Sequence, residues 1–109
     1  MSQIIVLKKN DRKPPVLAQA VDIDGNIVDL TDAVSVTFKM RIASGTTNKV
    51  SSSATIQNAK TGIMMYNWGD GDTDVPGNYN AIFVVNWGSD VPQTFPGKGF
   101  MIIQIEDTI

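Results

Sequence analysis

The chain has 109 residues, of which 42% are hydrophobic and 18% charged, and its 9 basic and 11 acidic residues give a formal net charge of −2. This length suits one hydrophobic core, and so balanced a charge provides no positive field that would gather nucleic acid or anionic lipid. Histidine and cysteine are absent, which excludes a disulfide framework, zinc ligation through thiolate or imidazole, and catalysis by a histidine base.

No segment is apolar over the ~20 residues that a bilayer requires. The apolar run at residues 4–7 is short, and its positive charges follow it, whereas those of a signal peptide precede the apolar region. We therefore expect the chain as given to be soluble, with neither a cleaved leader nor a membrane segment.

Alternation of apolar and polar side chains predicts strands along most of the chain. The alternation is clearest over residues 34–42 and 79–87, where every second side chain is apolar or aromatic. Shorter segments are rich in β-branched and aromatic residues. In chain order the predicted strands are 3–8, 16–22, 34–42, 54–57, 62–68, 79–87 and 100–106.

Turn residues separate these strands at intervals typical of a sandwich or barrel. The sequence supports a helix only at residues 29–33, and there as a single turn. The sequence therefore predicts one all-β domain over residues 1–109, an immunoglobulin-like antiparallel β-sandwich of about seven strands. Asp74, Gly77 and Tyr79 lie where a chain would cross between the two sheets. Their pattern predicts a tyrosine corner, in which the tyrosine hydroxyl hydrogen-bonds back to an upstream backbone group.

Ten short sequence motifs occur in order along nearly the whole chain. They are Lys9-Asn10-Asp11-Arg12, Pro14-Pro15, Asp24-Gly25-Asn26, Val28-Asp29-Leu30-Thr31-Asp32-Ala33, Val36-Thr37-Phe38-Lys39-Met40-Arg41, Gly62-Ile63, Tyr66-Asn67-Trp68, Asp72-Thr73-Asp74-Val75-Pro76-Gly77-Asn78-Tyr79, Thr94-Phe95-Pro96 and Gly99-Phe100. In this order and spacing the chain resembles the N-terminal domain family of bacteriophage upper baseplate proteins. It departs from that family at Asn10, where the usual residue before Asp is glycine.

The resemblance implies a virion protein of the phage tail or baseplate, assembled in the host cytoplasm, that binds other copies of itself or neighbouring tail proteins. It implies no catalysis and no cofactor. Nucleic acid and membrane are not expected partners. The alternative is a carbohydrate-binding or host-surface adhesion module, and a bacterial immunoglobulin-like adhesion domain is a third, more remote interpretation.

Carboxylates are the remaining candidates for chemistry, but they gather in turns rich in Asp and Gly. Asp70, Asp72 and Asp74 have the alternate spacing of half a calcium loop. The sixth position of such a loop is Val75 where glycine is needed, and the twelfth is Ala81 where glutamate is needed. We interpret these aspartates as turn-shaping residues and predict neither a catalytic site nor a metal site.

Two further groups have a functional and a structural interpretation. Trp68 and Trp87 could stack on a sugar, but each shares its strand face with other apolar residues and is more simply part of the core or its edge. The basic group Lys8, Lys9, Arg12 and Lys13 is interpreted as a solvated loop, with the acidic rim of a partner as the alternative.

Apolar residues on the second face of two predicted strands are the main functional prediction. If the faces with Tyr79 and Tyr66 point to the core, Ile82 and Val84 point outward on one strand and Ile63 and Met65 on the other. Such residues are covered either by a partner or by the chain's own N-terminal strand or loops. We predict that these four residues form an interface. Exchange of residues 3–8 between copies is a related prediction.

Overall fold

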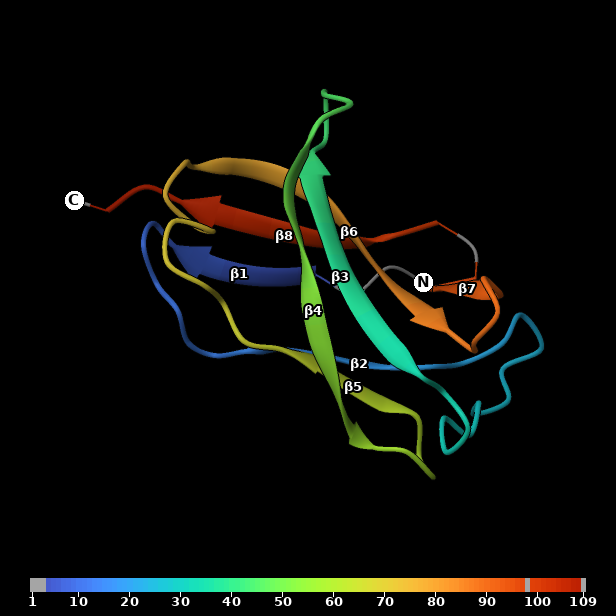
Figure 1. Ribbon diagram of the computed structural model, residues 1–109. Helices are drawn as coiled ribbons and strands as arrows, with labels where there is room; N and C mark the ends of the chain where they lie inside the picture. The colour runs from blue at the N-terminus through green and yellow to red at the C-terminus, as the bar shows by residue number, and fades with distance from the viewer. Residues whose placement is uncertain (1–3, 98, 109) are drawn as a thin grey trace.

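The computed structural model of the chain describes residues 4–97 and 99–108. These residues form eight strands and no helix (Figure 1). The strands are β1 (Ile4–Lys8), β2 (Val16–Gln19), β3 (Ser35–Ile42), β4 (Asn48–Asn58), β5 (Ile63–Tyr66), β6 (Gly77–Asn86), β7 (Pro92–Phe95) and β8 (Met101–Glu106). The all-β prediction is confirmed, and no helix in the described ranges has the length and apolar character to cross a membrane.

The strands follow the continuous order β1-β8-β6-β3-β4-β5-β2. β7 pairs with the second half of β6, on the edge whose first half pairs with β8. We call β1, β8, β6, β7, β3 and the first half of β4 the larger layer. The second half of β4 pairs with β5 instead, and with β2 it forms the smaller layer. The long strand β4 therefore belongs to both layers and turns the sheet back over its own inner face (Figure 1).

Side chains from the inner faces of both layers meet in one hydrophobic core. Phe38 of β3 lies at its centre, stacked on Tyr66 of β5 with ring centroids 4.5 Å apart and 5.1 Å from the ring of Phe83 on β6. Trp68 meets the Phe38 ring edge-on at 5.7 Å. Each such aromatic pair adds about 0.5–1.5 kcal/mol beyond the burial of its area, so this cluster joins the layers.

Two strands, β4 and β7, differ most from the expected strands. β4 begins at Asn48, six residues before the predicted start at 54, because pairing with β3 overrides the weak strand preference of its serine-rich first half. β7 was not predicted because Pro92 and Pro96 bracket it and read as turn residues. Its position at an edge explains why proline is tolerated there. Gln3, the predicted start of the first strand, lies outside the described residues.

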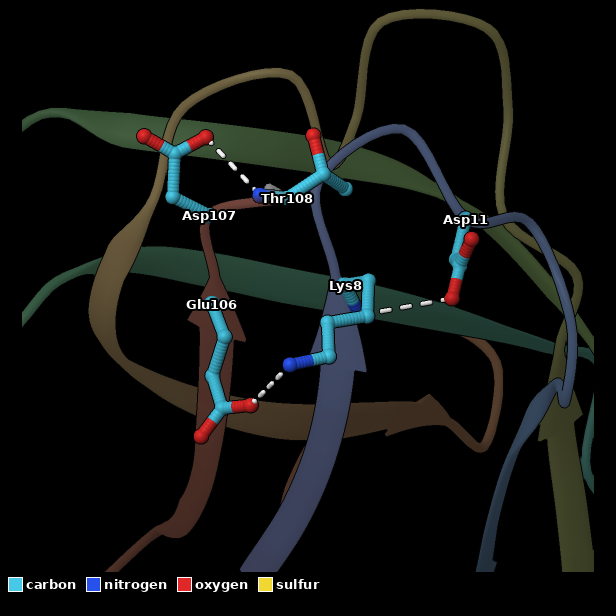
Figure 2. A network of polar contacts seen from close by, with 5 residues as sticks. All are labelled: Lys8, Asp11, Glu106, Asp107 and Thr108. Carbon is cyan, nitrogen blue, oxygen red and sulfur yellow. Dashed lines mark hydrogen bonds and ion pairs between the residues drawn. The ribbon is translucent and has the colours of Figure 1, made fainter.

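The terminal strands depart from a purely antiparallel arrangement. β1 pairs with β8 in parallel, in the register Ile4 with Ile102 through Lys8 with Glu106. At the end of this ladder the Lys8 Nζ lies 2.8 Å from Glu106 Oε1, and the Lys8 backbone N–H donates to Asp11 Oδ2 at 3.3 Å (Figure 2). β1 therefore widens the larger layer in its own plane and does not fold over either outer face.

Candidate functional site

The outer face of the larger layer carries the first predicted interface pair. Ile82 and Val84 of β6 are half-buried and point away from the core, because Ala81, Phe83 and Val85 between them are buried. Across the sheet Ile82 is opposite Lys39 of β3, and Val84 is opposite Thr94 of β7. Because the described strands all pair edge to edge, none of them lies above the outer side chains of β6.

A shallow groove of about 360 Å³ opens on this outer face beside Ile82. We call it the basic groove, because its lining includes two cations and no carboxylate among the described residues. It is lined by Lys39, Met40, Arg41, Asn48, Asn80, Ile82, Thr94, Gly99 and Phe100. The exposed ring of Phe100 lies between the ends of β7 and β8 and contributes apolar surface to the groove.

Apolar side chains continue from this region to the β1 edge. Ile102 of β8 points outward between buried Met101 and Ile103. Its neighbour in register, Ile4 of β1, is 62% exposed, and Val6 is 51% exposed on the same face. These residues were not among the predicted interface residues. The period-2 alternation of 101–105 could have identified Ile102, but the parallel placement of β1 beside it is set by tertiary pairing.

The second predicted pair lies on the outer face of the smaller layer. Ile63 and Met65 of β5 are half-buried and point outward, because Met64 and Tyr66 between and after them are buried in the core. Leu17 of β2 lies opposite Met65 and is 42% exposed. The structure therefore places the two predicted pairs on different layers, each pointing away from the shared core.

The predicted corner residues lie on the crossing from β5 in the smaller layer to β6 in the larger layer. The Tyr79 hydroxyl donates to the carbonyl oxygen of Val75 at 2.6 Å, and the Tyr79 side chain is buried. Gly77 has φ +151°, a backbone conformation that side chains disfavour. The third predicted residue, Asp74, contacts β4. Its carboxylate lies 2.5 Å from Lys49 Nζ of β4, and this hydrogen bond lowers the pKa of Asp74.

The connection between β1 and β2 is fastened to the same crossing. Thr73 is buried, and its hydroxyl donates to the Asp11 carbonyl at 2.8 Å, while the Asn10 N–H donates to the Thr73 carbonyl at 2.9 Å. The Trp68 indole N–H donates to the carbonyl of Pro14 at 3.1 Å. Sequence motifs that lie about 60 residues apart are thus joined by hydrogen bonds in the fold. These bonds give the motifs a structural role.

Two acidic residues of this crossing, Asp72 and Asp74, are engaged in protein contacts. The Asp72 carboxylate accepts hydrogen bonds from the Tyr66 hydroxyl and from the Gly69 N–H. Burial, followed by the bond to Asp72, raises the pKa of Tyr66 to about 12. Within 4–97 and 99–108, no group of three or more acidic side chains is arranged to hold a metal ion. The bond from the Gly69 N–H to Asp72 lies within the turn, as a turn-shaping aspartate requires.

The tryptophans and the basic group lie as follows. Trp68 is buried in the aromatic cluster. Trp87 is half-buried at the edge of the core, and its indole N–H donates to Gln93 Oε1 at 3.0 Å. In the basic group, Lys8 pairs with Glu106 and the Arg12 Nε–H donates to the Trp68 carbonyl at 3.1 Å. The two indole rings are not combined in one open platform.

Comparison with known proteins agrees with the family indicated by the sequence motifs. No curated protein matches the chain. A family model described as the BppU N-terminal domain matches residues 1–103. Since this match spans nearly the whole sequence, the chain belongs to the BppU N-terminal domain family of baseplate upper proteins and is a structural protein of the phage baseplate, in the virion tail.

Proposed function

We propose that this domain is a non-enzymatic building block of the baseplate that works by packing its outer sheet faces against other copies of itself or against neighbouring tail proteins. One observation carries the proposal: two outer faces, on different layers, display apolar side chains over which none of the described strands lies. Contiguous outward apolar area on a sheet is typical of an interface. We propose assembly in the host cytoplasm, with residues 1–109 acting as one domain.

The face of the larger layer is the better candidate for the principal contact. Phe100 lines the groove beside Ile82, and Ile102, Ile4 and Val6 add apolar side chains farther along the face toward the β1 edge, so the apolar character is wider than the two predicted residues. The smaller layer offers Ile63, Met65 and Leu17 as a second surface. An assembly that closes into a ring by head-to-tail contacts needs two such surfaces on each copy.

The proposal is tested by light scattering coupled to size-exclusion chromatography over about a hundredfold range of protein concentration. We expect the double substitution Ile82→Thr and Val84→Thr to weaken assembly while the circular dichroism spectrum stays that of the native protein. Asn78→Thr, on the exposed outer side of the same strand, is the matched control and should leave assembly unchanged. Unchanged assembly in the double variant would count against the use of this face.

The alternative, a carbohydrate-binding or host-surface adhesion module, has weaker support. Its aromatic platform would need both tryptophans, but Trp68 is 2% exposed and Trp87 is half-buried and hydrogen-bonded to Gln93. Stacking on sugar requires an open ring face. Saturable binding of a surface glycan by a monomer that neither assembles nor binds tail proteins would favour the alternative.

A further inference from the structure

We infer that the basic groove binds the acidic connection between β2 and β3 of a second copy of this chain. We define the acidic connection as residues 22–32. The inference rests on the proposed function, because it requires that the outer face of the larger layer takes part in self-packing. It adds the chemistry of the contact and the segment that occupies the groove.

The groove has an uncompensated positive charge. Lys39 and Arg41 occupy alternate positions of β3, so both lie on the outer face and both line the groove. Neither forms an ion pair within the part of the chain that the structure describes. The carboxamides of Asn48 and Asn80 lie beside them, and these groups can donate further hydrogen bonds to a carboxylate.

Charge is segregated along the sequence around this groove. Residues 33–69 contain Lys39, Arg41, Lys49 and Lys60 but no aspartate or glutamate. The acidic connection, immediately before them, contains Asp22, Asp24, Asp29 and Asp32 but no lysine or arginine. One copy therefore presents a cationic sheet face and an anionic connection, which are complementary surfaces for two copies.

The carboxylates of the acidic connection divide into two pairs. Asp22 Oδ1 accepts hydrogen bonds from the N–H groups of Asp24 and Asn26, and Asp29 Oδ1 accepts from the N–H of Thr31, so these two aspartates hold the local turns. The side chains of Asp24 and Asp32 are exposed and make no hydrogen bond or ion pair with the other described residues. Asp24 and Asp32 are therefore available to a partner.

The position of the connection suits a contact with another copy. It loops outward beyond the start of β3 (cyan in Figure 1). Lys39 and Arg41 both lie in the second half of that strand. Within one copy no ion pair joins the two regions in the described chain. Electrostatic attraction between the basic groove of one copy and the acidic connection of another would set the orientation of the two molecules. The apolar residues beside the groove would then pack against the partner.

The test is a charge exchange. Lys39→Glu with Arg41→Glu reverses the groove, and Asp24→Lys with Asp32→Lys reverses the connection. We expect each double variant to weaken self-association at least about tenfold in sedimentation velocity experiments. An equimolar mixture should restore it, because the acidic groove of one variant then meets the basic connection of the other. Lys13→Glu and Asp70→Lys, exposed charges outside both surfaces, are the controls and should assemble like the wild type.

Several results would overturn the inference. A mixture that fails to reassemble, or groove variants that assemble normally, would show that the two surfaces do not meet. A wild-type protein that stays monomeric but binds polygalacturonate through Lys39 and Arg41 would reassign the groove to an acidic glycan. If Ile82→Thr with Val84→Thr weakens assembly and the groove variant does not, the proposed function stands and this inference fails.

Discussion

Replacement of Tyr79 by phenylalanine tests how the crossing between the layers is held. The substitution removes one hydroxyl and leaves the buried ring in place, so the change in the free energy of unfolding reports the 2.6 Å bond to the Val75 carbonyl. A buried neutral hydrogen bond contributes about 1 kcal/mol, and about 1–2 kcal/mol is lost where the partner is left unsatisfied. With a denaturant slope of about 1–1.5 kcal/mol/M for a domain of this size, the urea midpoint should fall by about 1 M.

The matched control is Thr55→Val. The Thr55 hydroxyl also donates to a backbone carbonyl, that of Met65, but the residue is exposed on β4 and water can replace the bond. We expect its midpoint to move by less than about 0.3 M. Equal midpoints for Tyr79→Phe and Thr55→Val in urea melts followed by circular dichroism would refute the idea that the tyrosine hydroxyl stabilises the crossing.

Three further predictions concern the same end of the molecule. Thr73→Val removes the buried hydroxyl that holds the Asp11 carbonyl and should lower the free energy of unfolding by about 1 kcal/mol in urea melts; no change would mean that water substitutes fully. Asn10 has φ +70°, so Asn10→Gly should be neutral or stabilising and Asn10→Ala should cost about 1 kcal/mol, with the reverse order in thermal melts as the contradicting result. The raised pKa of Tyr66, about 12 because of burial and Asp72, has no effect on stability below pH 10, where both states are protonated, and stability should fall as pH rises from 10 toward 12. Tyrosinate absorbance checks this, since ionisation of both tyrosines near pH 10 in the native protein would contradict it.

Period-2 alternation was a reliable guide to the strands that have one buried and one outward face. The segments 34–42 and 79–87 became β3 and β6 within two residues at each end, because burial of every second side chain requires that pattern. The first half of β4 and the whole of β7 lack the pattern, and their strands exist because β3 and β6 offer neighbouring hydrogen-bonding edges. The immunoglobulin-like subclass and the tyrosine corner stay predictions within the confirmed all-β class.

The candidate surfaces were predictable only in part. The outward direction of Ile63, Met65, Ile82 and Val84 follows from alternation along single strands, and the structure agrees with it. The basic groove depends instead on Phe100, which reaches β6 from the turn after β7, and on a register that pairs β3 with β6. Neither of these is encoded in a local pattern. The interface role of all four residues stays a prediction.

The parallel pairing of β1 and β8 has a mechanical consequence. Both strands run in the same direction, so the ladder places Ile4 at one end and Glu106 at the other (Figure 1). A tensile force applied between these residues slides one strand along the other and loads the backbone hydrogen bonds of the ladder together, rather than opening them one at a time. A domain that transmits force between its terminal strands should therefore yield abruptly, and single-molecule pulling would show this as one sharp rupture.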